Sequence, residues 1–133
     1  MKVVLDANVV IAVLIRPDGS TGRRLARADV EPFVPETLAN ELTRNEIELS
    51  ARAGIGVAAW RPRVRAFLRG VSVVPLAATR RHARHRLVLV AAAVDPDDAC
   101  YVAALVACKG DFLWTRDKAL LGALPGIAVL VPP

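Results

Sequence analysis

A chain of 133 residues has the length of one ordinary domain, and we expect residues 1–133 to form one. Its apolar runs are far shorter than the ~20 residues of a membrane-spanning helix, and Asp6 interrupts the N-terminus too early for a signal peptide. A cytoplasmic protein with no membrane association is therefore expected. The two cysteines and two histidines lack a metal-binding spacing, which argues against a zinc site. The net charge of +5, carried mainly by arginine, suits a nucleic-acid partner, although an arginine- and alanine-rich proteome would give the same balance.

Segments typical of strands and of helices alternate along the chain. Short apolar or β-branched runs predict strands at residues 2–5, 32–35, 71–75, 112–115 and 127–131. Helical spacing of apolar residues, with caps and breakers between, predicts helices at residues 9–15, 20–28, 36–51, 54–70, 79–93 and 95–108, and a short one after 117. This alternation predicts an α/β fold with a central parallel sheet of about five strands and helices on both faces.

Two aspartates follow predicted strands. Asp6 comes directly after the first strand, and Asp117 comes shortly after the fourth. Sites in open α/β sheets form beyond the carboxyl ends of the strands, so both carboxylates are candidates for one site. Each aspartate has an alternative role as the cap of the next helix, for which Asn8 and Thr115 compete. Two strands that each deliver an acid to one edge favour the functional interpretation.

Three further aspartates, Asp95, Asp97 and Asp98, surround a proline at the start of a predicted helix. A capping aspartate, a proline at the first position and acids in the first turn are a favourable helix start without any chemistry. Their mutual repulsion, however, is a cost that a bound cation would remove. Asp98 is the preferred site residue because its face of the helix continues into apolar residues, and Asp95 is the expected cap.

Glu41 lies in the middle of a predicted helix, between Leu38 and Leu42 on the expected inward face. An unpaired charge there is costly, so this carboxylate needs a partner. Arg44 and Arg116 are near these acids in the sequence and are candidates to hold a nucleic-acid backbone.

The acids fall within four motifs that together resemble PIN-domain proteins, especially the ribonuclease toxins of bacterial toxin–antitoxin modules. The motifs, which span nearly the whole chain, are VVLDANVVI at Val3–Ile11, PETLANEL at Pro35–Leu42, DPDDACYVAAL at Asp95–Leu105 and WTRD at Trp114–Asp117. No single motif is unique, but four in this order are fairly specific.

The resemblance implies a metal-dependent endoribonuclease with a single PIN-like domain. It also implies an acidic site, with Asn8 and Thr115 as supporting polar groups, whose catalytic residues are Asp6, Glu41, Asp98 and Asp117. Mg²⁺ or Mn²⁺ suits such oxygen ligands. Asp6, Asp98 and Asp117 are the expected metal ligands, and Asp95 or Asp97 is the alternative to Asp98. For toxin members, the resemblance implies a cognate antitoxin and a homodimer.

Two other functions remain open from the sequence. One is a phosphatase of the haloacid-dehalogenase type with Asp6 as nucleophile, although such enzymes usually carry a second aspartate where this chain has Asn8. The other is a catalytically inactive PIN-like module that binds RNA or a partner protein. The presence of all four acids argues against a loss of catalytic activity.

Overall fold

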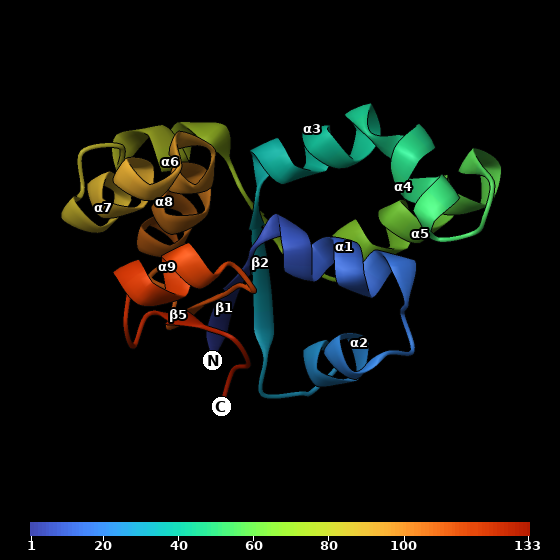
Figure 1. The fold of residues 1–133 in the computed structure, drawn as a ribbon, viewed down its shortest axis with the longest axis horizontal. Helices are drawn as coiled ribbons and strands as arrows, with labels where there is room; N and C mark the ends of the chain where they lie inside the picture. The colour runs from blue at the N-terminus through green and yellow to red at the C-terminus, as the bar shows by residue number, and fades with distance from the viewer.

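The computed structural model describes residues 1–133, in which five strands alternate with helices (Figure 1). The strands are β1 (Lys2–Leu5), β2 (Glu31–Pro35), β3 (Ser72–Val74), β4 (Phe112–Trp114) and β5 (Ala128–Val129). The helices are α1 (Ala7–Ile15), α2 (Ser20–Leu25), α3 (Glu36–Arg44), α4 (Glu46–Arg52), α5 (Val57–Arg69), α6 (Leu76–Arg81), α7 (Arg86–Val94), α8 (Ala99–Ala107) and α9 (Lys118–Ala123), with a 3-10 turn, η1, at Pro96–Asp98. None of these helices is long and apolar enough to span a membrane.

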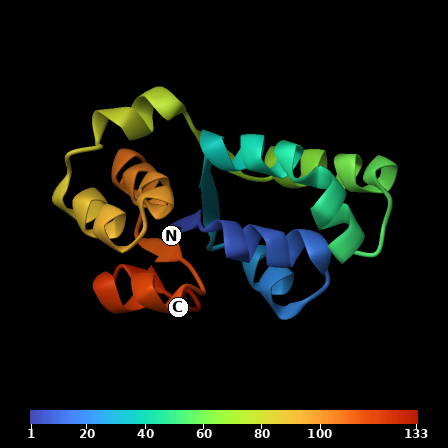
Figure 2. The same ribbon diagram turned by 45° about the horizontal axis from the view of Figure 1, so that its top comes forward.

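All five strands are parallel, in the order β3-β2-β1-β4-β5. The prediction of an α/β fold with a five-stranded parallel sheet is therefore confirmed. β1 is the central strand, and its residues Val3, Val4 and Leu5 are fully buried, as expected for a β-branched run covered on both sides. Helices lie on both faces of this sheet, with α1 to α5 on one side and α6 to α9 on the other (Figures 1 and 2).

The chain changes direction once within the sheet. From β1 it proceeds outward to β2 and β3, and it then crosses to the opposite side of β1 to form β4 and β5. The carboxyl ends of β1 and β4 therefore flank the point where the strand order reverses. In doubly wound sheets, this is where binding sites form.

Two predicted helices are each broken in the structure. The helix expected at residues 36–51 divides at Asn45 into α3 and α4, which turns Leu49 into the core and places Glu46 beside α5. The segment expected to be helical at residues 79–93 divides into α6 and α7, because His85 caps α7 by accepting a hydrogen bond from Leu87 N at its Nδ1 (3.2 Å). Histidine is not among the usual capping residues, so no residue type at this position predicts the break.

The ends of the other helices and strands differ less from those predicted. The helix expected at residues 95–108 begins as the 3-10 turn η1 before it continues as α8, and α2 ends at Leu25 rather than at residue 28. Strand β5 is limited to two residues instead of the five expected.

Candidate functional site

The ends of β1 and β4 bring two polar residues into contact. Leu5 of β1 is opposite Trp114 of β4, and the pairing continues one step further through a hydrogen bond from Asp6 N to Trp114 O (3.0 Å). The hydroxyl of Thr115 then donates to Asp6 Oδ2 over 2.6 Å. Both side chains are buried, with exposed fractions of 3% for Asp6 and 0% for Thr115. The sheet register therefore determines this contact.

Asp6 is both the N-cap of α1 and the centre of the polar cluster. Its Oδ1 accepts from Ala7 N (2.7 Å), and its Oδ2 accepts from Asn8 Nδ2 (3.1 Å) as well as from Thr115. The helix-cap role and the site role that the sequence suggests for Asp6 are thus compatible, because the two carboxylate oxygens have different partners. Burial raises the pKa of Asp6, while the hydrogen bonds from Thr115 and Ala7 act in the opposite direction.

Asp117 repeats this arrangement at the end of β4. Its Oδ1 caps α9 by accepting from Ala119 N (2.8 Å) and Leu120 N (3.2 Å), and Oδ2 makes no hydrogen bond. Its own backbone N–H donates to Thr115 Oγ1 (3.0 Å), so the threonine hydroxyl links the two aspartates. The charge of Asp117 contributes to the raised pKa of Asp6, which places the carboxylates within electrostatic range of each other.

Asp98, at the end of η1, is the third acid of the cluster. Burial is the largest cause that raises the pKa of Asp98 to about 6, followed by the charges of Asp6, Asp95 and Asp117 in that order. Its Oδ2 is buried and has no hydrogen-bond partner. Asp95 instead caps η1 through its Oδ1, which accepts from Asp97 N (2.9 Å), and both Asp95 and Asp97 are exposed.

Glu41 lies half-buried on α3, next to the buried Leu38 and Leu42. Burial is the main cause of the raised pKa of Tyr101 at the start of α8, and Glu41, Asp6 and Asp98 all contribute to the shift through their charges. Glu41 therefore faces the same end of α8 as the aspartates. It makes no hydrogen bond to them.

The two candidate arginines differ in their position relative to the acidic cluster and in their contacts. Arg116 adjoins the cluster, because its backbone N–H donates to Asn8 Oδ1 (3.2 Å) and its Nη2 donates to Thr21 Oγ1 (2.7 Å). Arg44 is exposed in the last turn of α3 and makes neither a hydrogen bond nor an ion pair.

Sequence reasoning missed two polar residues near these acids. Thr37 is one helical turn before Glu41, and its Oγ1 is buried without a hydrogen-bond partner. Thr21 anchors Arg116 from α2. Threonines give little signal in a sequence, because most of them are surface or capping residues.

The acids have the chemistry of a divalent-cation site. No three acidic, histidine or cysteine side chains already form a metal-binding group, and both oxygens of Asp6 are engaged in hydrogen bonds. However, Asp98 Oδ2 is buried without a partner, Asp117 has one oxygen free, and the carboxylates repel one another. A hard cation would relieve all three conditions, so the donor set fits Mg²⁺ or Mn²⁺.

Residues 4–129 match the family model described as PIN domain. The chain belongs to the PIN-domain family. PIN domains are generally nucleases, and the matched segment includes every acid of the site described above. Membership in this family sets aside the haloacid-dehalogenase interpretation of Asp6.

A solved structure shares the PIN fold of this chain. The crystal structure of VapBC2 from Rickettsia felis, bound to a DNA fragment from their promoter, matches with a TM-score of 0.64. The match covers 97% of this chain and 98% of that chain, at 12% sequence identity. A search among curated proteins finds no significant match.

Proposed function

We propose that this PIN domain is a metal-dependent endoribonuclease that hydrolyses phosphodiester bonds of single-stranded RNA. The observation that carries the proposal is the buried, unpartnered Oδ2 of Asp98, which faces the charges of Asp6 and Asp117 at the point where the strand order reverses. A buried oxygen without a partner is costly, and such groups are concentrated at functional sites.

In this proposal, Asp6, Asp98 and Asp117 hold Mg²⁺ or Mn²⁺. When bound, the cation supplies Lewis-acid stabilisation of the phosphate charge and activates water for in-line attack. Thr115 and Asn8 fix the orientation of the Asp6 carboxylate through their hydrogen bonds to Oδ2. Asp98 is preferred over Asp95 and Asp97 because those two are exposed and Asp95 already serves as a cap.

Glu41 completes the chemistry as the proton acceptor. The oxygen of water forms a bond to phosphorus, one P–O ester bond breaks, and the proton released by the water passes to the Glu41 carboxylate. The leaving oxygen takes a proton from solvent. A carboxylate that is half-buried and makes no hydrogen bond is available for this role.

We also propose that the protein is the toxin of a toxin–antitoxin module, with a cognate antitoxin and a homodimeric state. The similarity to VapBC2 supports this assignment through the shared fold. Exposed apolar side chains on α7, Leu89, Val90 and Val94, provide surface that a partner would cover.

The test is cleavage of a fluorophore-labelled single-stranded RNA by the purified protein in Mg²⁺, in Mn²⁺ and in EDTA. We expect cleavage only with metal, and loss of about 100-fold or more in rate for Asp6→Asn, Asp98→Asn, Asp117→Asn and Glu41→Gln. Glu48→Gln, an exposed change on the neighbouring α4, is the matched control and should retain the rate.

The outcomes separate the alternatives. Cleavage in EDTA, or full activity of Asp6→Asn, would overturn the metal mechanism. Loss of activity in Asp97→Asn rather than in Asp98→Asn would reassign the third acid. Binding of RNA without cleavage under any metal condition would show a catalytically inactive PIN module.

A further inference from the structure

A polar cavity with arginine side chains in its wall lies beside the acidic site. It is lined by Ala12 of α1 and its C-cap Arg16, by Gly19, the N-cap of α2, with Ser20 and Thr21 of that helix, and by Arg116. No acidic residue lines it, and its two arginines form no ion pair. The cavity is thus a cationic recess without a counter-ion within the chain.

The cavity is connected to the acidic site along one face of α1. Asn8, Ala12 and Arg16 are spaced four residues apart and so follow one another on that face, at intervals of ~6 Å. Asn8 donates to Asp6 Oδ2, and its Oδ1 accepts from the backbone N–H of Arg116. Two hydrogen bonds therefore join the carboxylate of Asp6 to the wall of the cavity.

Both arginines of the cavity are exposed, and the guanidinium of Arg116 is oriented by a hydrogen bond within the chain. Arg116 donates to Thr21 Oγ1 (2.7 Å), and Arg16 extends past Gly19, where an added Cβ would lie 3.4 Å from Arg16 Cγ. An adjoining cavity shares Thr21 and Arg116 and extends to Arg24, whose Nη1 donates to Pro132 O (2.8 Å). Positioned guanidinium groups beside hydroxyls are the chemistry that binds phosphate.

We propose that Arg16, Arg116 and the Thr21 hydroxyl form a subsite for a backbone phosphate of the RNA, next to the phosphate that is cleaved. This inference rests on the proposed function and specifies how the strand is held: one phosphate at the acids and its neighbour in the cavity beside α1 and α2, which lie together in Figures 1 and 2. The subsite binds the backbone, so it positions the strand without reading its sequence.

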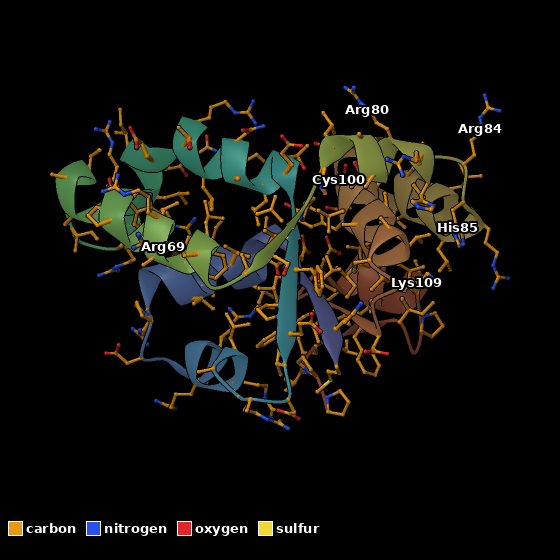
Figure 3. All side chains as sticks on the ribbon, turned by 180° about the vertical axis from the view of Figure 1, so that it is seen from behind. Arg69, Arg80, Arg84, His85, Cys100 and Lys109 are labelled. Atoms are coloured by element: carbon orange, nitrogen blue, oxygen red, sulfur yellow. The ribbon has the colours of Figure 1, made fainter.

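The test measures binding separately from turnover. A labelled single-stranded oligouridine is titrated with the full-length protein in EDTA, and the dissociation constant is obtained from fluorescence anisotropy at several salt concentrations. The variants are Arg16→Gln, Arg116→Gln and Thr21→Val. Arg84→Gln removes the same charge from a residue that projects outward from the far side of the molecule, beside α6 and α7 (Figure 3), and is the matched control.

We expect Arg16→Gln and Arg116→Gln each to weaken binding about tenfold and to reduce the slope of log Kd against log salt by about 0.7. Thr21→Val should weaken binding less, because it removes a neutral hydroxyl of the subsite and the anchor of Arg116 but no charge. Arg84→Gln should stay within about twofold of the wild type.

Two results would overturn the subsite. One is equal weakening by Arg84→Gln and Arg16→Gln, which would show a general effect of net charge. The other is unchanged binding in both Arg16→Gln and Arg116→Gln. Either result leaves the proposed nuclease activity standing if the wild type cleaves RNA, whereas failure of the wild type to cleave contradicts the proposed function itself.

Discussion

The hydroxyl of Thr115 donates to Asp6 Oδ2 over 2.6 Å, and Thr115 Oγ1 in turn accepts a hydrogen bond from the backbone N–H of Asp117 at 3.0 Å. A single side chain thus links the acids that follow β1 and β4. Thr115 is fully buried, so its hydroxyl makes both hydrogen bonds out of contact with solvent.

Thr115→Val, which keeps the shape but removes the hydroxyl, should therefore affect both stability and activity. We expect the free energy of unfolding to fall by about 1–3 kcal/mol, because two buried polar partners lose a bond. Urea unfolding measures this loss, and the RNA-cleavage rate should fall with it. Thr115→Ser should restore most of both properties, and a serine variant as impaired as the valine variant would show that packing of the methyl group matters instead.

Asp98→Asn should stabilise the protein without metal while it removes activity. The carboxylate is disfavoured by burial and by the charges of Asp6 and Asp95, and the neutral amide avoids that repulsion. Allowing for partial exposure of the side chain, the gain is on the order of 1 kcal/mol. Thermal unfolding in EDTA tests it, and a variant less stable than the wild type would contradict the repulsion.

The stability difference between Asp98→Asn and the wild type should depend on pH. The folded protein binds a proton at Asp98 near pH 6, whereas the unfolded chain does so only near the ordinary value of 3.8. A carboxyl whose pKa is raised in the folded state lowers the free energy of unfolding at pH values where it is ionised. The destabilisation by Asp98 is therefore full near pH 7 and shrinks as the pH falls towards about 4. The two melting temperatures in EDTA should converge over this range. A constant gap would exclude Asp98 as the titrating group.

The two tryptophans should respond differently to phenylalanine. Both are buried, but Trp114 Nε1 donates to Leu130 O (3.0 Å), whereas Trp60 Nε1 is buried without a hydrogen-bond partner. Trp60→Phe removes an unsatisfied donor and Trp114→Phe removes a satisfied one, so Trp114→Phe should cost about 1 kcal/mol more. Each variant retains one tryptophan, so its fluorescence during urea unfolding measures the difference. Equal losses would mean that the cavity left by the indole dominates.

Much of the fold could be predicted from the sequence, because the pattern of strands is local. The run at residues 2–5 is β-branched and apolar, and it forms the buried central strand β1. The break at Asn45 was not predictable, since no glycine or proline marks it. It arises from long-range packing of Leu49 and from the ion pair between Glu46 and Arg61, which is fifteen residues away.

The candidate site shows the same division between local and distant causes. Asp6, Asp98 and Asp117 are candidates from the sequence because each follows a strand or opens a helix, which is a local signal. In the sequence, the cap role of Asp6 competes with a functional role, and only the structure shows that its two oxygens serve different partners. The contacts of Arg116 with Asn8 and Thr21 span about a hundred residues, and no sequence pattern encodes them.

The pairing of β1 with β4 also sets the order in which the protein becomes competent during synthesis. Asp6 leaves the ribosome early, but its partner Thr115 is 109 residues further along, and closure of so long a loop is slow. A nascent chain carries an incomplete cluster until residue 117 and the helix after it have been made.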